Sequence, residues 1–350
     1  MKTLKTFLLV VATFLVFFAC KKEGPQGPEG PQGPLGPTGI NTTANPAIYG
    51  KWELVSGADE VKYIILKSNN FYYQLDSADY GFKSMESTLA IATYSQLYVA
   101  GMIFNYTISN DTLRLDNISD HIVLKKNNNA PDETQWITQL FVTDSISSPV
   151  PSGDGREDIV FDGTNILWLG TSSSNTLYKI NPVSHSVSST LALAHWYSNG
   201  CIDYASTFYW ISDNSVIDKV NPTTGAVVST SPSLSSSTII SNALTGQDMW
   251  YCNWSGKVYT WNIISNIITP QFEKYITGME YHGGYLYLFS DNYIYKCQLS
   301  PFESVTTFYV DHPNISGNCG GMLFDGIGFW VVGYDYNTNL YNLYKLSILI

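Results

Sequence analysis

An aromatic residue recurs about every forty positions through the second half of the chain. Each of these anchors lies in a short apolar run, with a second such run before it and a third after it. The spacings between successive anchors are 42, 40, 37 and 43 residues, and the anchors are Trp168, Trp210, Trp250, Tyr287 and Trp330. A nearly constant period of this length restricts the fold to repeated copies of one small unit, each with the anchor in its core.

Three apolar runs and a following Ser/Thr/Val run make four strands per period, which is the size of one β-propeller blade. We therefore predict a propeller over residues 134–350. Five blades are expected, with six as the alternative if another blade lies within residues 128–157. The last unit ends at Ile350 without room for a fourth strand. Residues 136–142, upstream of the first unit, could supply that strand, join the two ends of the propeller and remove both sheet edges.

One hairpin of the propeller indicates a family. The third run of the second unit continues into Asn221-Pro222-Thr223-Thr224-Gly225. This segment resembles the turn between the third and fourth strands of quinoprotein-like and YVTN-like extracytoplasmic propellers. The resemblance implies an exported propeller.

Residues 45–127 have short strand-like runs separated by turns of Asn, Asp and Ser, which is typical of an antiparallel meander. The opening Gly50-Lys51-Trp52 and the segment 106–115 resemble small lipocalin-like domains of secreted bacterial proteins. That resemblance implies a small barrel with Trp52 closing one end. Residues 85–98 remain open between a strand pair and a short helix. The expected fold class is all-β, a small lipocalin-like antiparallel barrel followed by the propeller.

The N-terminus reads as a lipoprotein signal. Lys2 and Lys5 precede an apolar stretch at 7–18, which is shorter than the roughly 20 residues that a membrane-spanning helix needs. Residues 1–19 are the predicted signal peptide. The sequence before Cys20 resembles a bacterial lipobox, which implies that Cys20 is lipidated and attaches the protein to a lipid bilayer.

Residues 20–44 are the predicted linker, and they contain a strict Gly-X-Y repeat from Gly24 to Gly39. A stiff polyproline spacer on a monomer is the favoured interpretation, and a short triple helix in a trimer is the alternative. The repeat resembles collagen-like segments that follow lipidation sites in Gram-negative surface lipoproteins. This resemblance places the protein at the outer membrane or cell surface.

Composition limits the partners and the cysteine chemistry. The net charge is −11 and only 13 % of residues are charged, which argues against nucleic acid as a partner. The four cysteines after Cys20 lack metal-ligand spacing. They are expected to be buried thiols, with Cys201–Cys319 as the preferred pair if a disulfide forms; the other two are Cys252 and Cys297.

The sequence contains no recognisable catalytic motif, and its five histidines have no ligand spacing, so we expect neither a metal nor a cofactor. Loop residues that could stack on a sugar or capture a peptide are Arg156, Trp196, Tyr197, Asn199, Tyr275 and His312. Three acids on predicted inner strands, which could line the propeller channel, are Asp158, Asp203 and Glu280.

Two functions follow from these residues. The first is a non-enzymatic lipoprotein that recognises an unidentified protein or glycan through the propeller face. The alternative is an extracytoplasmic lyase or hydrolase that uses the channel carboxylates. Convergence of the three acids at one channel mouth with a metal ion or water would favour the enzyme, whereas exposed Trp196 and Tyr197 beside an apolar or plugged mouth would favour recognition.

Overall fold

A computed structural model describes residues 43–57, 61–149, 157–170, 175–197, 200–315 and 320–348. The predicted signal peptide, Cys20 and the Gly-X-Y linker lie outside these residues. Within them, no helix is long and apolar enough to cross a membrane. The described chain is built almost entirely of β-strands, which confirms the predicted fold class.

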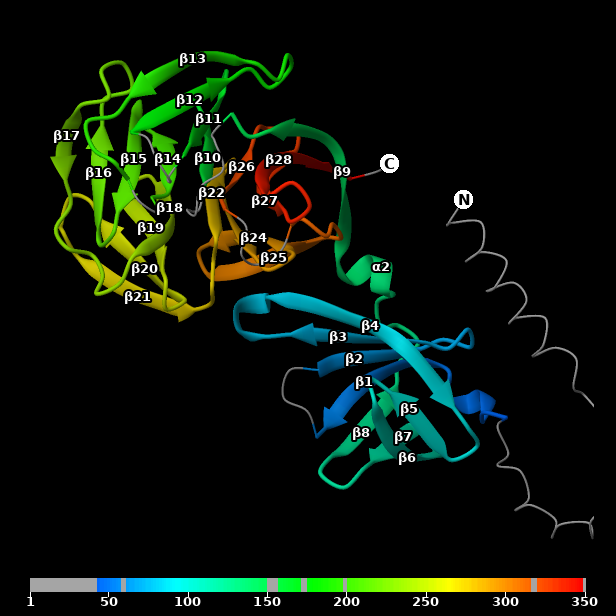
Figure 1. Cartoon of the computed structure of the whole chain (residues 1–350). Helices are drawn as coiled ribbons and strands as arrows, with labels where there is room; N and C mark the ends of the chain where they lie inside the picture. The colour runs from blue at the N-terminus through cyan, green and yellow to red at the C-terminus, as the bar shows by residue number, and fades with distance from the viewer. Residues whose placement is uncertain are drawn as a thin grey trace, which may run out of the picture. The chain divides into compact units, whose positions relative to one another are not determined.

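The first eight strands form a closed antiparallel barrel, in which β1 pairs with both β2 and β8 (Figure 1). Trp52 is fully buried in the barrel core, and its indole Nε1 donates a hydrogen bond to Ile48 O in the short helix η1 (Pro46–Ile48). Residues 85–98 are the strand pair of the two options. The strands are β1 (Gly50–Ser56), β2 (Val61–Leu66), β3 (Phe71–Ser77), β4 (Lys83–Ala92), β5 (Gln96–Val99), β6 (Met102–Ser109), β7 (Thr112–Asp116) and β8 (His121–Lys126).

After the helix α2 (Glu133–Trp136), the chain forms five four-stranded blades. Blade 1 contains β10 (Asp158–Phe161), β11 (Ile166–Leu169), β12 (Thr176–Ile180) and β13 (Val187–Ala192). Blade 2 contains β14 (Ile202–Ala205), β15 (Phe208–Asp213), β16 (Val216–Val220) and β17 (Val227–Thr230). Blade 3 contains β18 (Ile239–Thr245), β19 (Asp248–Asn253), β20 (Lys257–Asn262) and β21 (Ile268–Glu273). Blade 4 contains β22 (Gly278–His282), β23 (Tyr285–Ser290), β24 (Tyr293–Leu299) and β25 (Phe302–Val310). Blade 5 contains β26 (Met322–Phe324), β27 (Phe329–Asp335), β28 (Leu340–Ser347) and the upstream strand β9 (Thr138–Ser147).

An asparagine at the end of the third strand shapes the same turn in blades 1 to 3. The side-chain oxygens of Asn181, Asn221 and Asn262 each accept hydrogen bonds from the backbone N–H groups two and three residues later. Such Asx turns reverse the chain without help from distant residues. The repeated asparagine therefore sets where each outer strand begins.

The strand β9 closes the ring. Residues 141–147 pair antiparallel with β28, and residues 138–140 pair parallel with β25. The sequence predicted residues 136–142 for this closing strand. The strand that completes blade 5 lies a few residues later, because Trp136 belongs to α2 and packs against the barrel strands β2 and β3.

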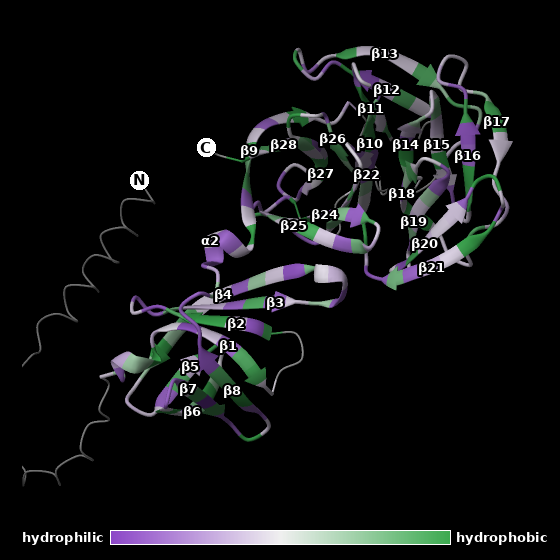
Figure 2. Ribbon diagram, turned by 180° about the vertical axis from the view of Figure 1, so that it is seen from behind, coloured by the Kyte–Doolittle hydropathy of each residue, from purple (hydrophilic) through white to green (hydrophobic). Residues whose placement is uncertain are grey.

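The inner strands form the channel wall. In sequence order β10, β14, β18, β22 and β26 each contact the next, and β26 contacts β10. All five anchor aromatics are buried, with at most 6 % of their surface exposed, in the clusters that pack blade against blade. The outer strands β13 and β17 are mostly exposed, and pale segments at Ser and Thr interrupt their green, hydrophobic ones (Figure 2). The predicted anchors are thus core residues.

The described cysteines lie in this core. Cys201 and Cys297 are buried thiols outside any disulfide, as predicted, and Cys252 is buried as well. Cys201, one half of the alternative bridge to Cys319, donates a hydrogen bond from its Sγ to Asn242 Oδ1 at 2.6 Å. Cys319 lies outside the described residues. Burial raises the pKa values of the Cys201 and Cys297 thiols, which disfavours their reactive thiolates.

Candidate active site in the propeller channel

Three carboxylates converge on the inner strands of blades 1, 2 and 4. Asp203 and Glu280 occupy equivalent positions, directly opposite the anchors Trp210 and Tyr287. Asp158 lies at the first position of β10, next to the residue opposite Trp168. The charges of Asp158 and Asp203 both act on Glu280, so the structure brings together the three acids that the sequence singled out.

Asp158 ties blade 1 to its neighbours. It is buried, and its two oxygens accept hydrogen bonds from Ile159 N and Ile202 N, each at 2.8 Å. On the other side it lies against blade 5, where a Cβ added to Gly321 would come within 1.3 Å of Asp158 Oδ1. Only glycine at position 321 leaves room for this carboxylate between the two inner strands.

Asp203 makes the equivalent tie one blade further on. Its Oδ2 accepts from Leu244 N on β18 at 2.8 Å, and the side chain is buried. Burial raises the pKa of Asp203, while the N–H groups of Leu244 and Tyr204 lower it. These donors stabilise the ionised carboxylate even though it is out of bulk water.

Glu280 differs from the two aspartates. The residue as a whole is half-buried, and none of the described residues donates a hydrogen bond to its carboxyl group. Burial raises its pKa well above the usual range, and the negative charges of Asp203 and Asp158 raise it further. Glu280 therefore keeps its proton to a higher pH than Asp203 does.

The channel therefore holds carboxyl groups with different pKa values, with that of Glu280 raised above that of Asp203. Nearby carboxyl groups whose environments push their pKa values apart are typical of acid–base sites. A protonated Glu280 can donate a proton to an oxygen of a bound molecule, and the resulting carboxylate can take a proton from water. Within the described chain, no group of three or more His, Cys, Asp or Glu side chains is placed to hold a metal ion.

The predicted loop site does not form as expected. Trp196 is 59 % exposed, but Tyr197 is only 1 % exposed, because its hydroxyl donates to the buried Asp218 carboxylate at 3.0 Å. Tyr197 is a core residue of blades 1 and 2 and cannot stack on a surface ligand. The other predicted loop residues, Arg156 and Asn199, lie outside the described residues.

The remaining two loop candidates are half-buried and lie against other aromatic rings. The ring of Tyr275 is edge-on to Trp254 at 6.3 Å. The ring of His312 lies 4.7 Å from Tyr344, and its Nδ1 accepts from Asn314 N. Burial lowers the pKa of His312, which favours the neutral imidazole. Both side chains pack within the propeller.

One further acid was not selected from the sequence. Glu157, directly before Asp158, is buried, and its Oε2 accepts hydrogen bonds from the indole of Trp168 and from Ser148 Oγ. Burial raises its pKa to about 8. The sequence shows that Glu157 directly precedes the first inner strand. It does not show that this carboxyl group contacts the indole of Trp168.

No family model matches the chain, and no curated protein matches its sequence. One solved structure that it is similar to is titled "Crystal structure of Myxococcus xanthus Glutaminyl Cyclase". The sequence identity is 7 %, the TM-score is 0.44, and the match covers 60 % of this chain and 96 % of that chain.

The first functional hypothesis from the sequence, a non-enzymatic recognition protein, is wrong and is corrected here. Tyr197, which was to form the recognition site with Trp196, is buried in the core, and the charges of Asp158 and Asp203 act on Glu280. The enzyme alternative replaces the first hypothesis.

Proposed function

We propose that this chain is an extracytoplasmic enzyme that transfers protons in the propeller channel, with Glu280 as the catalytic acid. The observation that supports this proposal is the position of Glu280 near Asp158 and Asp203, two carboxylates that accept hydrogen bonds from backbone amides and whose charges add to the burial that raises the pKa of Glu280. A hydrolase and a lyase share one requirement that Glu280 meets, which is protonation of the oxygen of the leaving group. Asp203 is a positioning residue whose charge keeps the proton on Glu280.

The protonation state of Glu280 can be tested without a known substrate. A diazo reagent esterifies protonated carboxyl groups, and mass spectrometry locates the label. We expect Glu280 to be labelled at pH 7 in the full chain, and we expect the label to fall in Asp203→Asn, since loss of a nearby negative charge lowers the pKa of Glu280. An unlabelled Glu280 at pH 7 contradicts the proposal.

Activity is tested on a panel of nitrophenyl glycosides, nitrophenyl esters and uronate-containing polysaccharides. Glu280→Gln should lower the rate on any substrate turned over by about 10²–10⁴-fold, which is the usual contribution of a general acid. Glu86→Gln, on the exposed face of β4, is the matched control. Equal rates for Glu280→Gln and the wild type would remove Glu280 from the mechanism.

We also propose that the enzyme is a lipoprotein of a Gram-negative outer membrane or cell surface, held by acylated Cys20 on a monomeric Gly-X-Y spacer. The lipobox-like sequence and the repeat support this. Palmitate labelling and membrane fractionation of Cys20→Ser provide the test, with loss of both label and membrane association expected. Light scattering of the delipidated protein tests the spacer, and a trimer contradicts it.

A further inference from the structure

The tip of the β3–β4 hairpin is seated on blade 4. It contains the short helix η2 (Asp79–Gly81), and the following Phe82 is buried with its ring 4.8 Å from that of Tyr295. Gly81 has a φ of +71°, and an added Cβ would lie 3.1 Å from Ser304 O. The backbone of the tip thus approaches β25 so closely that glycine is required there.

Tyr80 stands out in this tip. Its φ of 58° lies in the left-handed region, which bulky residues rarely occupy. Its ring lies 5.4 Å from Phe272 and 5.8 Å from Phe302, yet 44 % of the residue remains exposed. The side chain is therefore held in place by aromatic neighbours while one face stays open to solvent.

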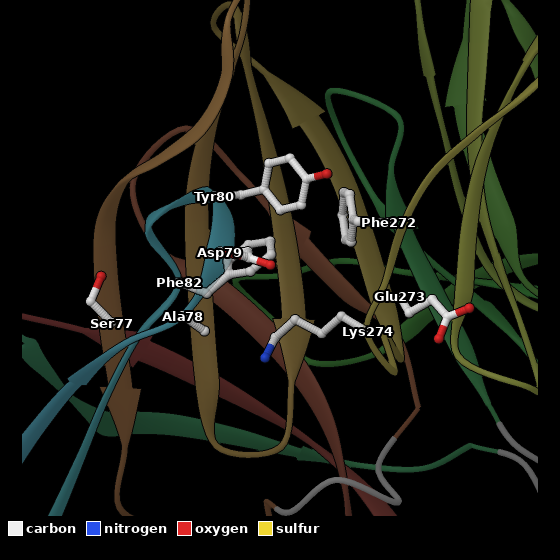
Figure 3. A pocket seen from close by; sticks show the side chains of 8 residues that line it. All are labelled: Ser77, Ala78, Asp79, Tyr80, Phe82, Phe272, Glu273 and Lys274. Carbon is white, nitrogen blue, oxygen red and sulfur yellow. The ribbon is translucent and has the colours of Figure 1, made fainter. Parts of the chain in front are cut away.

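That face borders a pocket of about 580 Å³, within the range of small-molecule sites. Figure 3 shows the rings of Tyr80 and Phe272 on one side of it, with Lys274 crossing below them. Lys274 Nζ lies 5.2 Å from the centre of the Phe82 ring and 4.9 Å from that of Tyr295. The lining residues are Ser77, Ala78, Asp79, Tyr80, Phe82, Phe272, Glu273 and Lys274.

The lining determines which ligand class fits. Carboxylates of Asp79 and Glu273 disfavour an anion, and the ammonium of Lys274 disfavours a cation. The polar groups also disfavour a wholly apolar chain such as a lipid tail. A neutral molecule with many hydroxyl groups and one apolar face fits all of these conditions, because carboxylates accept from hydroxyls, the ammonium donates to them, and an aromatic ring stacks on C–H groups.

We propose that this pocket binds a neutral saccharide unit of a glycan chain, with Tyr80 as the stacking platform. The site is separate from the channel and does not depend on the proposed catalytic function. It would hold a glycan through contacts from both the barrel and the propeller. The left-handed backbone conformation of Tyr80 places its ring at the edge of the pocket.

The test uses the full chain and defined probes, namely cellohexaose, maltohexaose, xylohexaose and chitohexaose. Binding is measured by calorimetry and by retardation in gels that contain the matching polysaccharide. We expect at least one probe to bind the wild type, Tyr80→Ala to weaken that binding at least about tenfold, and Tyr80→Phe to stay within about threefold, because stacking needs the ring. Tyr94→Ala is the matched control, since Tyr94 is an exposed tyrosine elsewhere on the barrel.

Two results would overturn the proposal. One is a wild type that binds none of the four probes. The other is a Tyr80→Ala protein that binds as tightly as the Tyr94→Ala control. Thermal unfolding of all variants separates a lost contact from a lost fold, and Tyr80→Phe serves as the binding-competent variant if Tyr80→Ala is unstable. Glu280→Gln should bind the probe like the wild type, which keeps this site distinct from the channel.

Discussion

Replacing Glu157 with glutamine should remove much of the sensitivity of this protein to alkaline pH. The Glu157 carboxyl is buried beside Trp168, and no cation among the described residues pairs with it. The folded protein therefore favours the protonated form, whereas the unfolded chain ionises near the ordinary value of 4.5. Glutamine has nearly the same shape and keeps an oxygen that can accept from the Trp168 indole and Ser148.

The sign and the size of the change in unfolding free energy with pH follow from proton linkage. Between the two pKa values the folded state binds more protons than the unfolded state, so stability is fully present below about pH 4.5 and is lost as the pH rises towards 8. A pKa raised from 4.5 to about 8 corresponds to about 5 kcal/mol in total. Between pH 5 and pH 9 the expected loss from Glu157 alone is about 4 kcal/mol.

Denaturant unfolding followed by tryptophan fluorescence at pH 5, 7 and 9 measures this loss. Wild type and Glu157→Gln should differ little at pH 5, and the variant should be the more stable protein by several kcal/mol at pH 9. The difference between the two proteins isolates Glu157, since all other titrating groups are shared. Parallel stability curves for the two proteins across this range would refute the reasoning.

Three further substitutions test the fold, and a control variant accompanies the first. Gly321→Ala places a Cβ 1.3 Å from Asp158 Oδ1 and should abolish soluble expression, whereas Gly283→Ala, which meets no atom within 4 Å, should cost about 1 kcal/mol; equal melting temperatures would contradict the crowding. Ile146→Ala, in the buried face of β9, should cost about 2–5 kcal/mol in denaturant unfolding, and a smaller loss would mean that β9 is not part of the core. Tyr197→Phe should lower the melting temperature by removing about 1–3 kcal/mol, because the hydrogen bond to the buried Asp218 carboxylate is lost; an unchanged melting temperature would contradict the role of that bond.

The repeat could be predicted because each blade carries its own local signals. The anchors of each period and the Asx turns lie within one unit, so their spacing is legible in the sequence alone. The closing strand β9 was predicted with the wrong bounds because its partner is far away in sequence. An apolar run can be read as a strand anywhere along its length, and only packing of Trp136 on the barrel decides where the strand begins.

The candidate site also combines features that local sequence predicts with features that depend on distant contacts. The three channel acids could be selected because they fall on inner strands, but their different roles depend on which backbone N–H groups of the next blade reach them. Trp196 and Tyr197 were assigned one role, although Trp196 is exposed and Tyr197 is buried, a difference that depends on the packing of blades 1 and 2. The pocket beside Tyr80 was missed because its two walls come from segments about 190 residues apart, and no local pattern joins them.

The pairing of β9 with β28 also determines when the propeller ring can close during folding. Thr143 and Ser347, which meet where β9 joins β28, are 204 positions apart in the chain. A polypeptide synthesised from its N-terminus delivers β9 long before its partner β28. The edge of β9 must therefore wait, unpaired, while four blades assemble, and contacts of such long sequence separation form slowly. This chain is accordingly most exposed to proteolysis and to aggregation in the interval before β28 is available to pair with β9.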